Sequence, residues 1–260
     1  MEIRNIGTPI TASQRHGYRE TPDSSFFTSF QAAFAAQTAS NTEPAKPPSS
    51  NSPAADSLSR ILGSTHSELS AMRGVSAESQ ATYAAVLNKA YSSGGIDNAR
   101  QFLGTLSAQE LEAVRQNHCL AAPIDTATLS EEGAENLLLP EGYSVDLNHD
   151  GIDEVGAART AHFPPSDAPA EFREAWFQAT AGLDEGMMMT YGLMMHDAVY
   201  GMQINGQSQP APYPADDIDS YRSIVRDYLA SLENTKAWLA DGQYERDKAF
   251  FGKLQGLLGV

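Results

Sequence analysis

The sequence has little cysteine, few basic residues and no long apolar run, and each shortage excludes a class of protein or site. Cys119 is the single cysteine among 260 residues, so an intrachain disulfide and a cysteine-based zinc site are both excluded. Since Cys119 lies beside Leu120 after a predicted helix, we expect its thiol to be buried and unreactive.

Signals for membrane insertion and export are equally scarce. No stretch approaches the roughly 18 apolar residues of a transmembrane helix. The first residues lack the basic start and the apolar run of a secretory signal peptide. We therefore expect no membrane span and a cytoplasmic location, or secretion by a route that is independent of a signal peptide.

Positive charge is in short supply. Lysine and arginine number 17 against 33 acidic residues, which gives a formal net charge of −16. Residues 1–55 carry four of each kind, so the acidic excess lies in residues 56–260. A body this acidic repels nucleic acid and anionic membranes, and it suits cations or a basic partner. Solubility alone is the simpler explanation of the same charge.

Motifs of known enzyme classes are missing. The sequence contains no nucleophile elbow, P-loop, HExxH helix or dinucleotide fingerprint. Acidic pairs such as Glu131-Glu132 lie at predicted helix starts, where the helix dipole explains them. His196 and Asp197 are a candidate ligand or catalytic pair, although adjacent helical residues do not face the same way. We predict a non-enzymatic protein, with an enzyme of unknown type as an alternative.

Residues 1–55 are rich in Ser, Thr, Ala, Gln and Pro, and this composition predicts a disordered arm. Four phenylalanines share one helical face within it: Phe26, Phe27, Phe30 and Phe34. Ser24 or Ser25 can cap this helix. The helix either docks on a partner or on the protein's own body, or forms only transiently. The arm is similar in composition to the export regions of type III secretion substrates, which implies a secreted bacterial effector or accessory protein as an alternative function.

Residues 56–260 show the apolar spacing of helices. Ser107 and Glu110 form a capping-box pattern, and a long helix is predicted from residues 216–219 onward. The fold class we predict is mainly α: a single helical globular domain, with a soft split near residues 140–165.

Methionines gather in the predicted helix from Met187 to Met202. Met188, Met195 and Met202 are seven residues apart, and this spacing favours packing in a helical core. A flexible groove for an apolar protein partner is the second interpretation. A Cu(I) site made of thioethers is the third.

Residues 146–154 carry the one motif with a defined chemistry. Oxygen-bearing side chains alternate at Asp146, Asn148 and Asp150, and Gly151 follows at the position of a sharp turn. Ile152 can offer its carbonyl oxygen, and Glu154 supplies a further carboxylate. Position 8 of the loop is Asp153, where an apolar residue is usual. Position 12 is Ala157, where an EF-hand has its bidentate glutamate.

This pattern resembles the DxDxDG calcium-binding loops that lie outside true EF-hands, such as dockerin-type loops and the hairpin loops of FG-GAP blades. The resemblance covers the loop alone and is not repeated in the chain. It implies that Ca2+ is held by five residues: Asp146, Asn148, Asp150, Ile152 and Glu154. It implies neither a dockerin nor a propeller fold.

The flanks of the loop distinguish it further from an EF-hand. Pro140 and Gly142 lie just upstream, and residues 143–145 favour extended backbone. We therefore predict a short hairpin-like element rather than two flanking helices. An Asx-turn loop whose acids face water is the alternative without an ion. The leading functional hypothesis is a calcium-binding protein whose ion clamps this loop and tunes a protein–protein contact.

Overall fold

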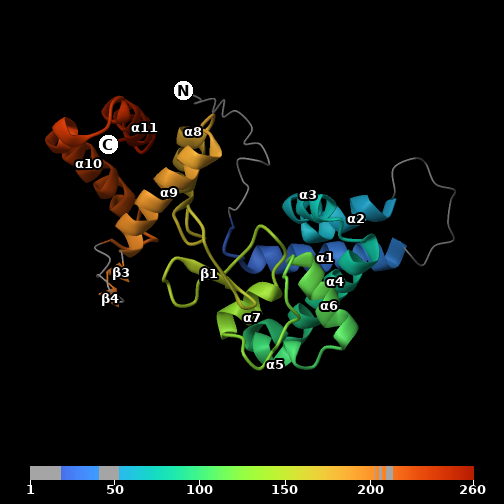
Figure 1. The fold of residues 1–260 in the computed structure, drawn as a ribbon. Coiled ribbons are helices and arrows are strands. Elements are labelled where there is room, and N and C mark those ends of the chain that lie inside the picture. Colours follow the sequence, from blue (N-terminus) through green and yellow to red (C-terminus); the bar gives the residue numbers. More distant parts are fainter. Residues whose placement is uncertain (1–18, 41–52, 202, 205–206, 209–212) are drawn as a thin grey trace. The chain divides into compact units, whose positions relative to one another are not determined.

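The computed structural model describes residues 19–40, 53–201, 203–204, 207–208 and 213–260 (Figure 1). The mainly α class is confirmed: the described residues form eleven α-helices and two short antiparallel hairpins. Our predictions for the remaining parts of the arm and for Met202 lie outside these residues.

The described chain divides into two compact units, residues 19–161 and residues 162–260. The boundary lies inside the range where we predicted a split. The first unit contains α1 (Ser24–Ser40), α2 (Pro53–Leu62), α3 (Ser64–Arg73), α4 (Ala77–Ser93), η1 (Gly95–Asn98), α5 (Ala99–Leu103), α6 (Ala108–Asn117), α7 (Glu131–Leu137), β1 (Ile152–Val155) and β2 (Ala158–Ala161). The second contains α8 (Ala170–Thr180), α9 (Glu185–Tyr200), β3 (Gln203–Ile204), β4 (Gln207–Ser208), α10 (Ile218–Thr235), η2 (Lys236–Trp238) and α11 (Gln243–Leu257).

Part of the N-terminal arm that we predicted to be disordered is ordered, because it forms helix α1. The carboxylate of Asp23 accepts the amide of Phe26 at 2.9 Å and so caps the helix, whereas we had expected Ser24 or Ser25 in this role. The helix lies on α2 and α4 (Figure 1). Phe30 is 2% exposed and belongs to the core of the first unit. The phenylalanine spacing therefore predicts the helix correctly, and the helix docks on the protein's own body.

We expect Phe30→Ala to lower the free energy of unfolding by about 3–5 kcal/mol, because it removes a buried aromatic ring that links α1 to the core. Urea denaturation followed by circular dichroism measures this change. Phe27, which is only half-buried on the same helix, is the control, and Phe27→Ala should cost less than half as much. Equal losses in the two variants would contradict the docking of Phe30.

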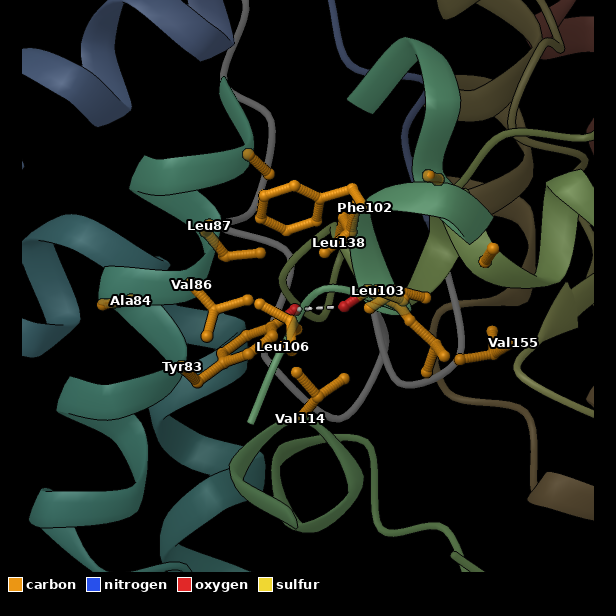
Figure 2. Close-up of a cluster of buried hydrophobic side chains, with 14 of the residues drawn as sticks. Tyr83, Ala84, Val86, Leu87, Phe102, Leu103, Leu106, Val114, Leu138 and Val155 are labelled. Atoms are coloured by element: carbon orange, nitrogen blue, oxygen red, sulfur yellow. Dashed lines mark hydrogen bonds between the residues drawn. The ribbon is translucent and has the colours of Figure 1, made fainter. Parts of the chain in front are cut away.

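The core of the first unit is built around the fully buried Tyr83. Figure 2 shows Tyr83 on the same helix as Val86 and Leu87, with Leu106 and Val114 near its ring. The hydroxyl of Tyr83 donates to the carbonyl oxygen of Leu139 at 2.7 Å, so the polar end of this buried ring is satisfied.

The thiol of Cys119 is exposed, so our expectation of a buried cysteine is wrong. Cys119 follows α6 with a φ of 53°, the left-handed conformation that reverses the chain at a helix end. The amide of Leu120 then donates to the carbonyl oxygen of Arg115 at 3.0 Å. This backbone turn places the cysteine at the surface, although its neighbour His118 is buried.

In the second unit, stacked aromatic pairs hold the helices together. Phe172 stacks on Tyr221 at 3.7 Å, and Tyr191 stacks on Phe250 at 3.9 Å between ring centroids. Met195 is 1% exposed, as expected for core packing, whereas Met188 of the same predicted stripe is only half-buried.

Candidate metal centre

Helix α7 positions the predicted calcium loop through Asn136, which is fully buried. Its side-chain oxygen accepts the amide of Val145 at 2.8 Å. Its side-chain nitrogen donates to the carbonyl oxygens of Val145 at 2.9 Å and of Glu154 at 2.8 Å. One amide side chain therefore ties the entrance of the loop to its exit.

Glu132, one turn before Asn136 on the same helix, also holds the loop through hydrogen bonds. Its carboxylate accepts the amide of Leu147 at 3.0 Å and that of Glu154 at 2.9 Å. Burial raises the pKa of the Glu132 carboxyl, and the nearby charges of Asp146 and Glu154 raise it further, against the lowering effect of the two amides. The loop motif does not reveal this role of Glu132, because the residue lies outside the motif, on the preceding helix. An acidic residue at a helix start is already explained by the helix dipole.

Close packing of two glycines completes the support of the loop. The amide of Gly156, in the turn between β1 and β2, donates to the carbonyl oxygen of Gly133 on α7 at 2.8 Å. A Cβ atom on Gly133 would lie 2.3 Å from the carbonyl oxygen of Gly156. The helix and the turn therefore meet backbone to backbone.

Inside the loop, side-chain oxygens accept hydrogen bonds from backbone amides. Asp146, which is 9% exposed, accepts the amides of Asp150 at 3.2 Å and of Gly151 at 2.8 Å. Asn148 accepts the same Asp150 amide at 2.9 Å, and Asp150 accepts the amide of Ile152 at 2.9 Å. The oxygens at loop positions 1 and 3 thus converge on one amide. Gly151 has a φ of 74°, which explains the glycine at the turn.

The hairpin that we predicted at the loop is present as β1 and β2. Glu154 on β1 pairs in register with Arg159 on β2. The Arg159 guanidinium lies 3.3 Å from a carboxylate oxygen of Glu154 and 3.4 Å from one of Asp150. Ser130, which caps α7, also donates to Glu154. The Arg159 guanidinium therefore lies between the carboxylates at loop positions 5 and 9, Asp150 and Glu154.

The donor set fits a hard cation in its chemistry, because every predicted ligand atom is oxygen. Asp146 and Asn148 are brought together at the Asp150 amide, and Asp150 and Glu154 are brought together at Arg159. Among the residues that the structure describes, however, no three His, Cys, Asp or Glu side chains form a group that could hold a metal ion.

A cavity of about 610 Å³ lies beside the loop. Its acidic lining residues are Asp97, Glu131 and Glu135, and Leu147 of the loop also lines it. Arg100 pairs with Glu131 at 3.0 Å. Burial raises the pKa of the Glu135 carboxyl, and the charge of Asp97 adds to the effect. The cavity thus presents negative charge next to a half-exposed leucine.

The methionine helix α9 offers a second candidate surface. Met194 and Met195 line a cavity of about 250 Å³ together with Tyr228 and Phe251. On another part of α9, the side chain of Met189 is 73% exposed and that of Leu193 is 58% exposed.

The candidate pair on α9 is partly buried. His196 is 9% exposed, and its ring lies 4.8 Å from that of Tyr200, whereas Asp197 is half-buried.

No helix in the described ranges is long and apolar enough to cross a membrane. Comparison of the chain with protein-family models, with curated proteins and with solved structures finds no match.

Proposed function

We propose that residues 146–154 form a Ca2+ site in a non-enzymatic protein, with Asp146, Asn148, Asp150, Ile152 and Glu154 as oxygen ligands. The observation that carries this proposal is the convergence of the Asp146 and Asn148 side-chain oxygens on the amide of Asp150. Carboxylate oxygens that accept one amide keep further lone pairs for a cation.

Arg159 supplies the positive charge at this loop when no ion is bound. It pairs with both Asp150 and Glu154, so binding of Ca2+ at these carboxylates requires Arg159 to release them. The exchange is feasible because the guanidinium is largely exposed and surface ion pairs contribute only up to about 1 kcal/mol. Calcium suits this irregular loop better than magnesium, which requires a near-ideal octahedron.

Leu147 connects the loop to a protein contact. Its amide is held by Glu132, and it lines the acidic cavity. That cavity is lined by three acids and one arginine: Asp97, Glu131, Glu135 and Arg100. A change in the loop therefore reaches a surface that suits a basic partner.

Calorimetric titration with Ca2+ tests the proposal. We expect the wild-type protein to release or absorb heat and to gain thermal stability, because a ligand that binds only the folded state stabilises it. Asp150→Asn keeps an oxygen for the Ile152 amide but loses the charge, and should weaken binding at least about tenfold. Arg159→Gln should tighten binding by about twofold to fivefold, because it removes the competing cation.

The control is Asp125→Asn, which removes one charge from an exposed turn where Asp125 accepts the amide of Ala127 at 3.1 Å. It should leave Ca2+ binding unchanged. An unchanged melting curve for the wild type in excess Ca2+, or an equal loss in the Asp125 and Asp150 variants, would reject the site.

A further inference from the structure

A short and mostly buried segment, residues 139–144, fastens α1 to the rest of the first unit. We name it the strap. The amide of Glu20 donates to the carbonyl oxygen of Gly142 at 2.8 Å, and the amide of Ser144 donates to the carbonyl oxygen of Glu20 at 3.0 Å. Phe26 of α1 lies against Tyr143, with ring centroids 4.3 Å apart. The strap therefore forms a parallel bridge to the chain just before α1.

His66, on α3, holds the strap in turn. The His66 ring is fully buried, and its Nδ1 accepts the amide of Glu141 at 3.2 Å. Its Nε2 lies 2.9 Å from the side-chain oxygen of Asn117. The Asn117 nitrogen donates to the carbonyl oxygen of Ala113 at 2.8 Å, which leaves its oxygen facing the ring. His66 is thus neutral, with its proton on Nε2, and both ring nitrogens are satisfied.

Charged and titratable groups lie near this ring on each of the segments that pack around it. Glu141 of the strap pairs with Arg73 of α3 at 2.6 Å and with Arg19, before α1, at 3.4 Å. Tyr83 of α4 stacks on His66 at 5.5 Å, and His118, after α6, contacts the same tyrosine. Burial lowers the pKa of His66, and Arg73 lowers it further. Asn117 and the charge of Glu141 oppose this shift but do not cancel it.

We propose that protonation of His66 releases the strap and thereby undocks α1, so that the first unit contains an acid-sensitive latch. A proton on Nδ1 turns the acceptor of the Glu141 amide into a donor, and two donors then face each other in a buried site. Loss of this bond frees the strap, and with it the bridge to Glu20 and the ion pair between Arg19 and Glu141. Phe26 and Phe30 then leave their positions on the core.

The direction and size of the effect follow from the linkage between protonation and docking. The docked form has a lowered His66 pKa, so docking is fully stable above the ordinary pKa of about 6.5 and weakens as the pH falls below it. Because a released His66 has that ordinary pKa, the docking equilibrium can shift by up to about tenfold between pH 7.5 and pH 5.5.

Hydrogen–deuterium exchange of the full chain at these two pH values, corrected for the intrinsic rate, tests the latch. We expect exchange in α1 to rise by up to about tenfold at pH 5.5 and to remain faster than exchange in α4 at both pH values. Equal exchange rates in α1 and α4 at pH 5.5 would overturn the proposal, because acid would then unfold the whole unit, and so would an unchanged rate in α1. This comparison uses only the wild-type protein.

Two variants assign the effect to one histidine. His66→Asn retains an oxygen for the Glu141 amide and cannot take up a proton in this range, so exchange in α1 should become independent of pH. His118→Asn should keep the rise in α1 exchange that the wild-type protein shows. The reverse result, with the response lost only in the His118 variant, would overturn the assignment to His66.

Discussion

Gly133→Ala should lower the free energy of unfolding by about 3 kcal/mol or more. The added Cβ would lie 2.3 Å from the carbonyl oxygen of Gly156, a distance that real Cβ atoms essentially never show. That oxygen belongs to the backbone of a turn, which cannot swing aside as a flexible side chain does. Overpacking of this kind typically costs about 1–3 kcal/mol, and a rigid backbone neighbour places the cost at the upper end.

Urea denaturation followed by circular dichroism measures this loss, with Gly252→Ala as the matched control. Gly252 also lies within a helix, α11, but its added Cβ meets nothing within 4 Å. Alanine there should stabilise the protein by up to about 1 kcal/mol, because it has the higher helix propensity. If Gly133→Ala behaved like this control, the backbone contact between α7 and the hairpin turn would not exist.

Asn136→Ala should cost about 3 kcal/mol of unfolding free energy. The change leaves three polar groups without their partner: the amide and carbonyl of Val145 and the carbonyl of Glu154. Each unsatisfied buried group costs about 1–3 kcal/mol, and entry of water at the loop recovers part of the sum. The same variant should also weaken Ca2+ binding, since the two ends of the loop are no longer tied.

The control for this variant is Asn234→Ala, which changes an exposed asparagine near the end of α10. Its effect on stability should stay within about 0.5 kcal/mol. Urea denaturation and calorimetric titration with Ca2+ are applied to both variants. A loss below about 1 kcal/mol for Asn136→Ala would show that the amide side chain does not hold the loop.

Local signals in the sequence were enough to predict much of the helical structure. The capping box is present, with both the Ser107 and the Glu110 hydrogen bonds formed at the start of α6. The long helix predicted from residues 216–219 onward is α10, and Asp217 caps it. These features depend on residues within one turn of each other, and so they can be found without knowledge of the fold.

Features that depend on distant residues could not be predicted in the same way. Glu132 acts on the loop only because α7 packs against β1, and Arg159 reaches Glu154 only through the cross-strand register. Phe30 illustrates the same limit. Its spacing predicts an apolar helix face, but whether that face meets a partner or its own core depends on α2 and α4.

The bridge between Glu20 and Tyr143 also has a consequence for biosynthesis. The two residues are 143 − 20 = 123 positions apart, so α1 leaves the ribosome long before the strap does. At about 5–20 residues per second, the helix waits roughly 6 to 25 s for the strap, although α2 and α4, on which it lies, are made earlier. Throughout that interval Phe26 lacks its partner Tyr143, so this end of α1 is the part most open to chaperones and to other nascent chains.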